Sequence, residues 1–324
     1  MVQSKEAPRM KVLITGGLGF IGRYLAFHLL ESGYEVQIID NIHRWNFNEI
    51  ERYYNNDDSA RFLKEATSIG DITNENLMSQ LIKNTDLVIH LAAISRVNEA
   101  NNNPELTFDY NVKGTSIVAI LCNKFHKPMI FASSREVYGN ALRLPVSTSH
   151  PLNPANIYGA SKVWGEFIIK QLGMKNNLKY IIFRIANVYG PGDKDRVIPI
   201  FIQNALSNEP LIIKGKSKIL DFVYINDIVS AFDQAIKRFD NINGYTLNLG
   251  SGNGTSLIRL AQLIVRLTNS NSNIVIQENS PTNEVERFYA DITETKKALG
   301  WNPKVSLIKG LRTTIQYYHR GVQK

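Results

Sequence analysis

The stretch KVLITGGLGFIG, residues 11–22, constrains the fold of this chain more than any other feature. A short β-branched run ends in glycines, and apolar residues at helical spacing follow as far as Gly33, which predicts a strand, a glycine-rich turn and a helix. Gly16, Gly19 and Gly22 permit a tight turn whose backbone can approach a phosphate, and the N–H groups and dipole of the helix would attract that charge. The pattern indicates a dinucleotide-binding turn, although such glycines can also serve only to pack a strand against a helix.

The alternation of apolar strands and helical patterns continues as far as residue 190. Strands are expected in EVQIID, DLVIHLAA, PMIFASS and KYIIFRIANVYG, at residues 35–40, 86–93, 128–134 and 179–190. Near-continuous apolar strands separated by helices form parallel sheets that are covered on both faces. We therefore predict the α/β class, with a Rossmann doubly wound parallel sheet.

The length of 324 residues exceeds what one hydrophobic core usually serves, so we expect a second, smaller lobe. After residue 190 the pattern changes, and pieces of the sheet and of a substrate lobe are interleaved. We predict a dinucleotide-binding domain over residues 1–186, with returning segments at about 221–250, and a C-terminal substrate-binding domain over 187–220 and 251–324.

Composition excludes several classes of function. The net charge is +8, but Lys and Arg are interleaved with acids, so we expect an anionic small substrate and no nucleic acid.

The six histidines lack the spacing of metal ligands, and we expect no catalytic metal. The single cysteine, Cys122, lies in an apolar helical pattern, which predicts a buried packing residue in a reducing cytoplasm. No stretch approaches the ~18 apolar residues of a spanning helix, so we expect no membrane partner.

Asp40 ends the second predicted strand, where a carboxylate can accept hydrogen bonds from the ribose of an adenosine. A carboxylate there would repel a 2′-phosphate, which favours NAD over NADP. Arg44 is the one nearby feature that could accommodate that phosphate. Asp40 could also be a residue that only caps its turn.

Six short motifs, in this order and at these separations, resemble the extended short-chain dehydrogenase/reductases. Within that family the chain looks like the nucleotide-sugar epimerases and dehydratases, over a stretch that ends in ADITETKKALGW at residues 290–301. The motifs are TGGLGFIG (15–22), HLAA (90–93), NVKGT (111–115), SSREVYG (133–139), YGASK (158–162) and NVYGPGD (187–193).

The resemblance implies a bound NAD. The glycine turn would hold the phosphates, Asp40 the ribose, residues 71–72 the adenine edge, and the strand end at 91–93 the rest of the cofactor, with Asn111 as support. Small apolar residues at strand ends also pack in any doubly wound sheet. The expected cofactor-binding residues are Gly16, Gly19, Phe20, Ile21, Gly22, Asp40, Asn41, Asp71, Ile72, Leu91, Ala92, Ala93, Asn111, Tyr158, Lys162 and Ile185.

Tyr158 and Lys162 are the only Tyr and Lys in the chain at a spacing of four residues, which puts both on one helix face. By spacing alone they could be an ordinary surface pair. The resemblance makes Tyr158 the base for a sugar hydroxyl, with the Lys162 ammonium expected to lower the pKa of the phenol. It also implies that Ser134, otherwise a turn residue, bonds the reacting hydroxyl, while Ser133 matches a more structural position.

The first residue after Ser134 departs from the pattern of similar dehydratases, which carry Thr-Asp-Glu across these three positions, with the Asp and Glu as acid and base. Arg135 stands at the Asp position and cannot donate a proton at ordinary pH. Glu136 is retained and is a candidate catalytic base, or only a salt-bridge partner. Arg135 could instead meet a substrate carboxylate, which would suit a uronic-acid sugar.

The family's arginines for the nucleotide diphosphate are also missing. Leu220 occupies one expected position, and Ser280, Pro281 and Thr282 occupy the stretch of the other. Candidate replacements are Lys216, Lys218, Arg196 and Arg287. The expected substrate-binding residues are Arg135, Asn187, Arg196, Val197, Lys218 and Arg287.

The leading hypothesis is an NAD-dependent nucleotide-sugar 4-epimerase that oxidises C4 of a UDP-hexose or UDP-uronic acid transiently. A dehydratase or decarboxylase that uses Glu136 is the alternative within the family. A non-enzymatic NAD-sensing regulator is a third hypothesis, although such proteins usually have a damaged Tyr or Lys.

We also expect a homodimer, because the helical patterns at 104–126 and 156–172 resemble those that relatives use to pair. The apolar residues of these patterns could equally face the sheet. They are Ile117, Val118, Leu121, Val163, Phe167 and Ile168.

Overall fold

A parallel sheet in the order β10-β6-β5-β4-β1-β2-β3 forms the centre of the molecule. The structure is a computed structural model that describes residues 9–44, 47–49, 58–277 and 285–322. Within this part of the chain the sheet has seven strands: β1 (Lys11–Thr15), β2 (Glu35–Asp40), β3 (Thr67–Ile69), β4 (Leu87–His90), β5 (Met129–Ser134), β6 (Tyr180–Ile185) and β10 (Thr246–Leu249). The predicted doubly wound parallel sheet is confirmed.

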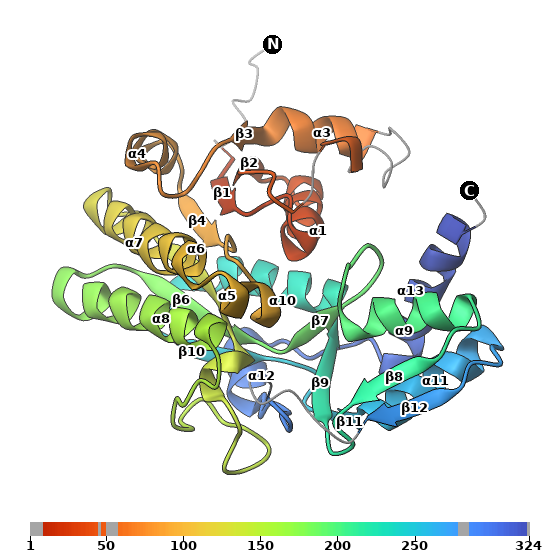
Figure 1. The fold of residues 1–324 in the computed structure, drawn as a ribbon. Coiled ribbons are helices and arrows are strands. Elements are labelled where there is room, and N and C mark those ends of the chain that lie inside the picture. Colours follow the sequence, from red (N-terminus) through yellow and green to blue (C-terminus); the bar gives the residue numbers. More distant parts are fainter. Residues whose placement is uncertain (1–8, 45–46, 50–57, 278–284, 323–324) are drawn as a thin grey trace.

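Helices cover both faces of this sheet (Figure 1). One layer contains α4 (Glu75–Lys83), α7 (Thr115–Lys124) and α8 (Ile157–Asn176), which pack in that order. The other contains α3 (Asp58–Ala66), α1 (Phe20–Glu31), α10 (Ile225–Lys237) and α12 (Thr293–Leu299). Shorter helical segments join strands to helices: α5 (Val97–Asn102), α6 (Pro104–Thr107), the π-helix η1 (Phe108–Gly114), and the 3₁₀ turns η2 (Arg135–Tyr138) and η3 (Phe239–Asn241).

A smaller group of elements packs beyond the end of the large sheet, on the right in Figure 1. Its sheets have the orders β11-β9-β7 and β12-β8. The strands are β7 (Asn187–Tyr189), β8 (Leu211–Lys214), β9 (Ile219–Tyr224), β11 (Gly254–Ser256) and β12 (Ile274–Gln277), and the helices are α9 (Val197–Leu206), α11 (Leu257–Thr268) and α13 (Leu307–Val322). The division into two domains stays a prediction; of the expected returning segment, β10 pairs with β6 and β9 pairs in the small sheet.

The stretch 179–190 was predicted as one strand, and here the structure differs. β6 ends at Ile185 in the large sheet, and β7 begins at Asn187 beside β9. The N–H of Ala186 between them donates to the Leu249 carbonyl at 2.8 Å, which completes the pairing of the large sheet before the chain leaves it. One continuous apolar run therefore forms a strand in each of two sheets. The sequence pattern does not separate them, because both strands are buried.

The strand order places the ligand crevice. From β1 the chain moves outward through β2 and β3 and then returns to β4 on the other side, so the carboxyl ends of β1 and β4 lie at a switch point. Ligands of doubly wound sheets bind in the crevice outside such strand ends. No helix in the described part of the chain has the length and apolar character to cross a membrane.

Candidate active site

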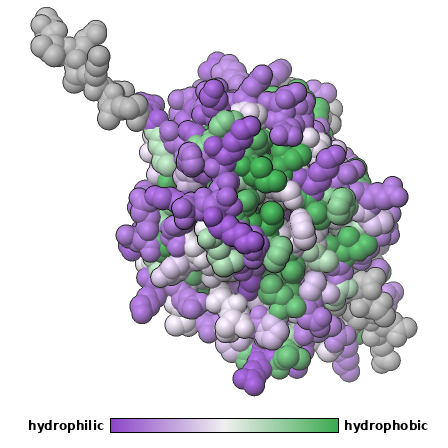
Figure 2. Space-filling view, turned by 90° about the vertical axis from the view of Figure 1, so that its left-hand side faces the viewer, coloured by the Kyte–Doolittle hydropathy of each residue, from purple (hydrophilic) through white to green (hydrophobic). Residues whose placement is uncertain are grey.

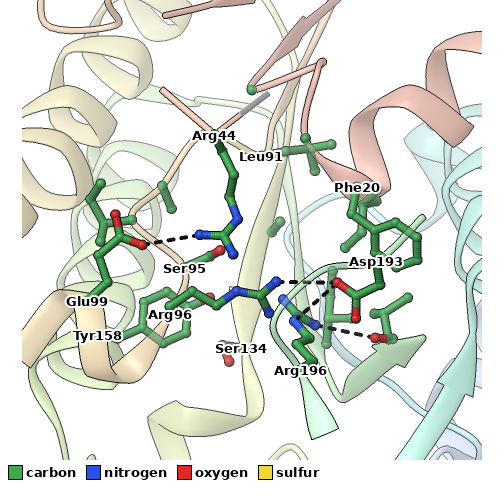
Figure 3. A pocket seen from close by; sticks show the side chains of 18 of the residues that line it. Phe20, Arg44, Leu91, Ser95, Arg96, Glu99, Ser134, Tyr158, Asp193 and Arg196 are labelled. Carbon is green, nitrogen blue, oxygen red and sulfur yellow. Dashed lines mark hydrogen bonds and ion pairs between the residues drawn. The ribbon is translucent and has the colours of Figure 1, made fainter. Parts of the chain in front are cut away.

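A cleft of about 660 Å³ lies at this crevice, between the loops of the large sheet and the small lobe. Figure 3 shows side chains from several of these loops converging on it. Most predicted site residues line the cleft: Gly16, Gly19, Phe20, Ile21, Gly22, Asp40, Asn41, Ile72, Leu91, Ala92, Ala93, Ser134, Arg135, Glu136, Tyr158, Lys162, Ile185, Asn187, Arg196, Val197 and Lys218. The remaining predicted residues, which are outside its lining, are Asp71, Asn111 and Arg287.

The glycine turn is shaped by close backbone contacts. Gly16 has φ +67°, and a Cβ there would lie 2.7 Å from the Cα of Ala92, so a larger residue would push the β1 and β4 loops apart. A Cβ on Gly22 would lie 2.6 Å from the carbonyl oxygen of Gly16. Gly19 caps α1 without a side chain, so nothing from the cap covers the first N–H groups of the helix. This turn fits a diphosphate.

Asp40 lies at the end of β2 and faces the cleft. Its carboxylate accepts the N–H of Leu18 at 3.0 Å and that of Ile42 at 2.8 Å, so it caps its own turn and also ties it to the glycine turn. Burial raises the pKa of this carboxyl group. Arg44 is paired with Glu99 at 3.4 Å (Figure 3) and with Asp195 at 3.0 Å, so two acidic partners hold its guanidinium.

Asn111, in η1, supports the site from behind. Its Oδ1 accepts the N–H of Ile94 at 2.8 Å, and its Nδ2 donates to the Ile94 carbonyl and to Ser161 Oγ, each at 3.0 Å. The buried amide thus joins the loop after β4 to α8. Asp71 accepts a 3.3 Å hydrogen bond from Asn41, beside the cleft-lining Ile72.

Tyr158 and Lys162 lie on the face of α8 that meets the end of β5. The side chain of Ser134 lies beside that of Tyr158 and favours its phenolate form. The Lys162 ammonium donates to the Ala132 carbonyl at 2.8 Å and lies 5.9 Å from the centre of the Tyr158 ring. The structure therefore brings together the three side chains that were predicted from the sequence to gather at one point, Ser134, Tyr158 and Lys162.

The expected lowering of the Tyr158 pKa is wrong for this site. Burial raises the pKa of Tyr158 to about 12 and outweighs the hydrogen bond from Ser134, which favours the phenolate. Burial also lowers the pKa of Lys162 to about 7, against the opposing charge of Glu166. Removal from water acts on both groups more strongly than their neighbours do, which helical spacing alone does not reveal.

Ser133 has the structural place expected of it. Its hydroxyl donates at 2.7 Å to Glu166, which is paired with Arg184 of β6 through contacts of 2.6 and 2.8 Å. Arg184 and Glu166 are both buried, and the charged pair holds α8 against the sheet behind Lys162.

Glu136 is buried, and both of its carboxylate oxygens are engaged. Oε1 pairs with Arg135 Nη2 at 2.8 Å, and Oε2 accepts a 2.8 Å hydrogen bond from Asn156 Nδ2. Asn156 also caps α8, because its side chain accepts the N–H of Gly159. Arg135 Nε donates to Asn187 Oδ1 at 3.3 Å.

A cluster of charged residues at the mouth of the cleft contains the predicted Arg196 and two residues that sequence reasoning missed, Arg96 and Asp193. Arg96 and Arg196 approach the buried Asp193 from two sides, at 3.4 and 3.8 Å (Figure 3). Burial raises the pKa of Asp193 to about 6, and Arg96 opposes this shift. Arg96 also bonds the carbonyl of Lys194. The position of Arg96 just after a strand end was the available signal, since loops at that edge build the site.

Two of the residues that were candidates for binding the nucleotide diphosphate do not line the cleft. Lys216 and Arg287 are exposed, whereas Lys218 is buried and lines the cleft together with Leu220. The stretch with Ser280, Pro281 and Thr282 lies outside the described residues.

A doubly wound sheet with a glycine turn, an acidic second strand end, and a Ser, Tyr and Lys beside the cleft defines a short-chain dehydrogenase/reductase. Comparison with known proteins narrows this class. The family model for GDP-mannose 4,6-dehydratase matches residues 13–314. The chain therefore belongs to this family of extended short-chain dehydrogenase/reductases, the nucleotide-sugar epimerases and dehydratases.

Three relatives illustrate the range of the family. A putative UDP-glucose 4-epimerase of Methanocaldococcus jannaschii is 33% identical over 94% of this chain and 97% of its own. A UDP-N-acetyl-α-D-glucosaminuronate decarboxylase of Bacillus cytotoxicus is 33% identical over 96% of this chain and 98% of its own. A mutant UDP-glucuronic acid 4-epimerase of Bacillus cereus, solved with UDP-4-deoxy-4-fluoro-glucuronic acid and NAD, has a TM-score of 0.88 and 26% identity, covering 96% of this chain and 99% of its own.

Proposed function

We propose that this protein is an NAD-dependent nucleotide-sugar 4-epimerase that acts on a UDP-hexose or a UDP-uronic acid. The observation that carries the proposal is the set of Ser134, Tyr158 and Lys162 at the end of a cofactor-shaped cleft, beside a Glu136 whose oxygens are both engaged. An epimerase needs the first three groups and needs no carboxylate base.

The cleft fits NAD. The turn from Gly16 to Gly22 would hold the diphosphate, Asp40 the adenosine ribose, and the strand end with Leu91 the middle of the cofactor. Asp40 and the acidic partners of Arg44 support NAD over NADP. When bound, NAD supplies reversible hydride acceptance at C4 of the sugar.

The chain's own groups handle the proton of the sugar hydroxyl. Ser134 would orient the C4 hydroxyl toward Tyr158, and the phenolate form of Tyr158 would take its proton and later return it. Lys162 would stabilise that phenolate through its nearby positive charge. Epimerisation also requires the sugar to turn over while its nucleotide stays bound.

Cleft residues of the small lobe would hold the nucleotide end. Asn187, Arg196 and Val197 line this side, and Arg196 supplies positive charge. Lys218, two residues before the apolar Leu220, supplies a further positive charge. We propose that these cations replace the arginine that relatives carry at the position of Leu220.

A decarboxylase or dehydratase is the second candidate, favoured by the Bacillus cytotoxicus relative and by the presence of Glu136. A dehydratase must remove the proton from C5, whereas a decarboxylase loses carbon dioxide from C5 after oxidation at C4 and must supply a proton there. Either step requires a carboxyl group that can move to the sugar. Glu136 would have to leave both Arg135 and Asn156 to do this. The epimerase reaction asks for no such change.

The test is incubation of the purified protein with UDP-, dTDP-, GDP- and CDP-sugars, followed by separation of the C4 epimers. We expect interconversion of a UDP-sugar with its 4-epimer and no net redox change. Tyr158→Phe should lower turnover by about 10²–10⁴-fold. Conversion of free alcohols or steroids alone would indicate an oxidoreductase. A wild type without turnover, whose Tyr158→Phe variant binds a protein partner as well as the wild type does, would indicate an NAD-sensing regulator.

We further propose a homodimer formed through α7 and α8. Val118 and Leu121 face the core, but Ile120, Trp164 and Phe167 are 48%, 43% and 51% exposed. Figure 2 shows hydrophobic residues gathered within a hydrophilic rim on the side of the molecule where these helices lie in Figure 1. Light scattering should give twice the chain mass, and a monomer at micromolar concentration would contradict this.

We also propose a cytoplasmic location. The buried Cys122 is a free cysteine, which suits a reducing compartment.

A further inference from the structure

Arg135 is the charged side chain next in sequence to Ser134, and it lines the same cleft. Its side chain is 11% exposed. Nη2 pairs with Glu136, and Nε donates to Asn187. The guanidinium carbon lies 5.8 Å from the centre of the Phe288 ring. Arg135 is therefore held in position by its neighbours.

One nitrogen of this guanidinium is left over. Nη1 is buried and has no hydrogen-bond partner among the described residues. A buried donor without a partner is unfavourable, and native structures satisfy nearly all such groups. An orphan N–H group at the wall of a substrate cleft points to an acceptor that the substrate brings.

The position of Arg135 indicates which part of the substrate this is. In the proposed function Ser134 and Tyr158 hold the C4 hydroxyl, so the adjacent Arg135 would lie beside C3 or C5 of the sugar. C3 carries a neutral hydroxyl, and C5 carries C6. In a hexose C6 carries a neutral hydroxyl, whereas in a uronic acid it carries a carboxylate. A guanidinium nitrogen forms its strongest hydrogen bonds with carboxylates.

We propose that Arg135 selects substrates with a carboxylate at C6, so that the preferred substrate is a UDP-uronic acid. This inference rests on the proposed function and narrows its substrate class. Arg135 keeps Glu136 from presenting an unpaired negative charge, because that carboxylate is shared between Arg135 and Asn156. The nearby Arg96 and Arg196 also add positive charge to the cleft.

The experiment compares kcat/KM for UDP-glucuronate and UDP-glucose in the wild type and in two variants. The wild type should prefer UDP-glucuronate by at least about 10²-fold, as expected for a buried charge pair. Arg135→Ser should lower the ratio of the two kcat/KM values by about 10²-fold, and Arg135→Lys should restore part of it. Arg143→Ser, which removes an exposed arginine outside the cleft lining, should leave the ratio as in the wild type.

Removing Arg135 alone leaves Glu136 short of a partner, so Arg135→Ser/Glu136→Gln is a second variant without that buried charge; it should show the same loss of preference. A wild type that epimerises UDP-glucose as efficiently as UDP-glucuronate overturns the inference and leaves the 4-epimerase standing. Equal losses on both substrates in Arg135→Ser also overturn it. A wild type that epimerises neither these two substrates nor any other UDP-sugar contradicts the proposed function itself.

Discussion

At the scale of single residues, the site keeps its reacting groups away from water. Lys162 is buried, and within the described part of the chain its ammonium has one hydrogen-bond acceptor, the Ala132 carbonyl. The helical spacing of Tyr158 and Lys162 was visible in the sequence, and so was the place of Ser134. The direction of the pKa shifts was not, because it depends on how much of the chain covers these groups.

The first prediction concerns Lys162→Met, which keeps the shape of the side chain and removes its charge. Turnover should fall by about 10²–10⁴-fold. At pH 6 the variant should be more stable than the wild type by a few kcal/mol, because a charged lysine is no longer buried. The measurement is urea unfolding, with UDP-sugar turnover measured in parallel.

The pH dependence of this effect has a fixed sign. The pKa of Lys162 is about 7 when folded, against an ordinary value of 10.5. Between these values the unfolded chain binds more protons, so the stability of the wild type rises with pH. The advantage of Lys162→Met is then largest at pH 7 and below and shrinks toward pH 10. An advantage that grows with pH would refute the assigned shift.

At the scale of elements, periodicity predicted much of the large sheet. EVQIID coincides with β2, and the predicted strands at 11–17, 86–93 and 128–134 contain β1, β4 and β5. The sequence did not separate β6 from β7, because both strands are buried and equally apolar. It also gave no sign that the cap of α8 contacts Glu136, since that contact depends on how η2 meets the helix.

The cap of α8 gives the second prediction. Asn156→Ala removes the acceptor for the Gly159 N–H and the donor to Glu136, and should lower the free energy of unfolding by about 2 kcal/mol. Asn156→Ser keeps an acceptor for the cap and loses the donor that reaches Glu136, so its loss should be smaller. Urea unfolding of both variants measures this. Equal losses would mean that the cap contributes nothing.

At the scale of the whole molecule, ion pairs join the cofactor-side loops to the loop that begins the small lobe. Arg96 and Arg44 follow β4 and β2, and their partners Asp193 and Asp195 follow β7. These contacts could not be read from the sequence, because the partners are about a hundred or more residues apart and meet only when both lobes are in place.

The third prediction compares two arginines of this junction. Arg96→Gln leaves Arg196 as the one ion-pair partner of the buried Asp193 among the described residues, and should cost about 3 kcal/mol of stability at pH 7.5. Arg44→Gln breaks more exposed pairs and should cost less than about 1 kcal/mol. The pKa of Asp193 is about 6, and removing Arg96 raises it. The Arg96→Gln loss should therefore shrink at pH 5, where Asp193 takes up a proton. Equal effects of the two variants, seen in urea unfolding, would contradict this account.

The most direct test of the central claim is the fate of C5 during turnover. The protein is incubated with UDP-glucuronate in deuterium oxide, and the products are followed by NMR. The account predicts the C4 epimer with protium retained at C5 and no loss of carbon dioxide, because Tyr158 acts at O4 and Glu136 stays bound to Arg135 and Asn156. Deuterium at C5, or a decarboxylated or dehydrated product, that disappears in Glu136→Gln would show instead that Glu136 acts as a catalytic acid or base and that this protein is not a simple epimerase.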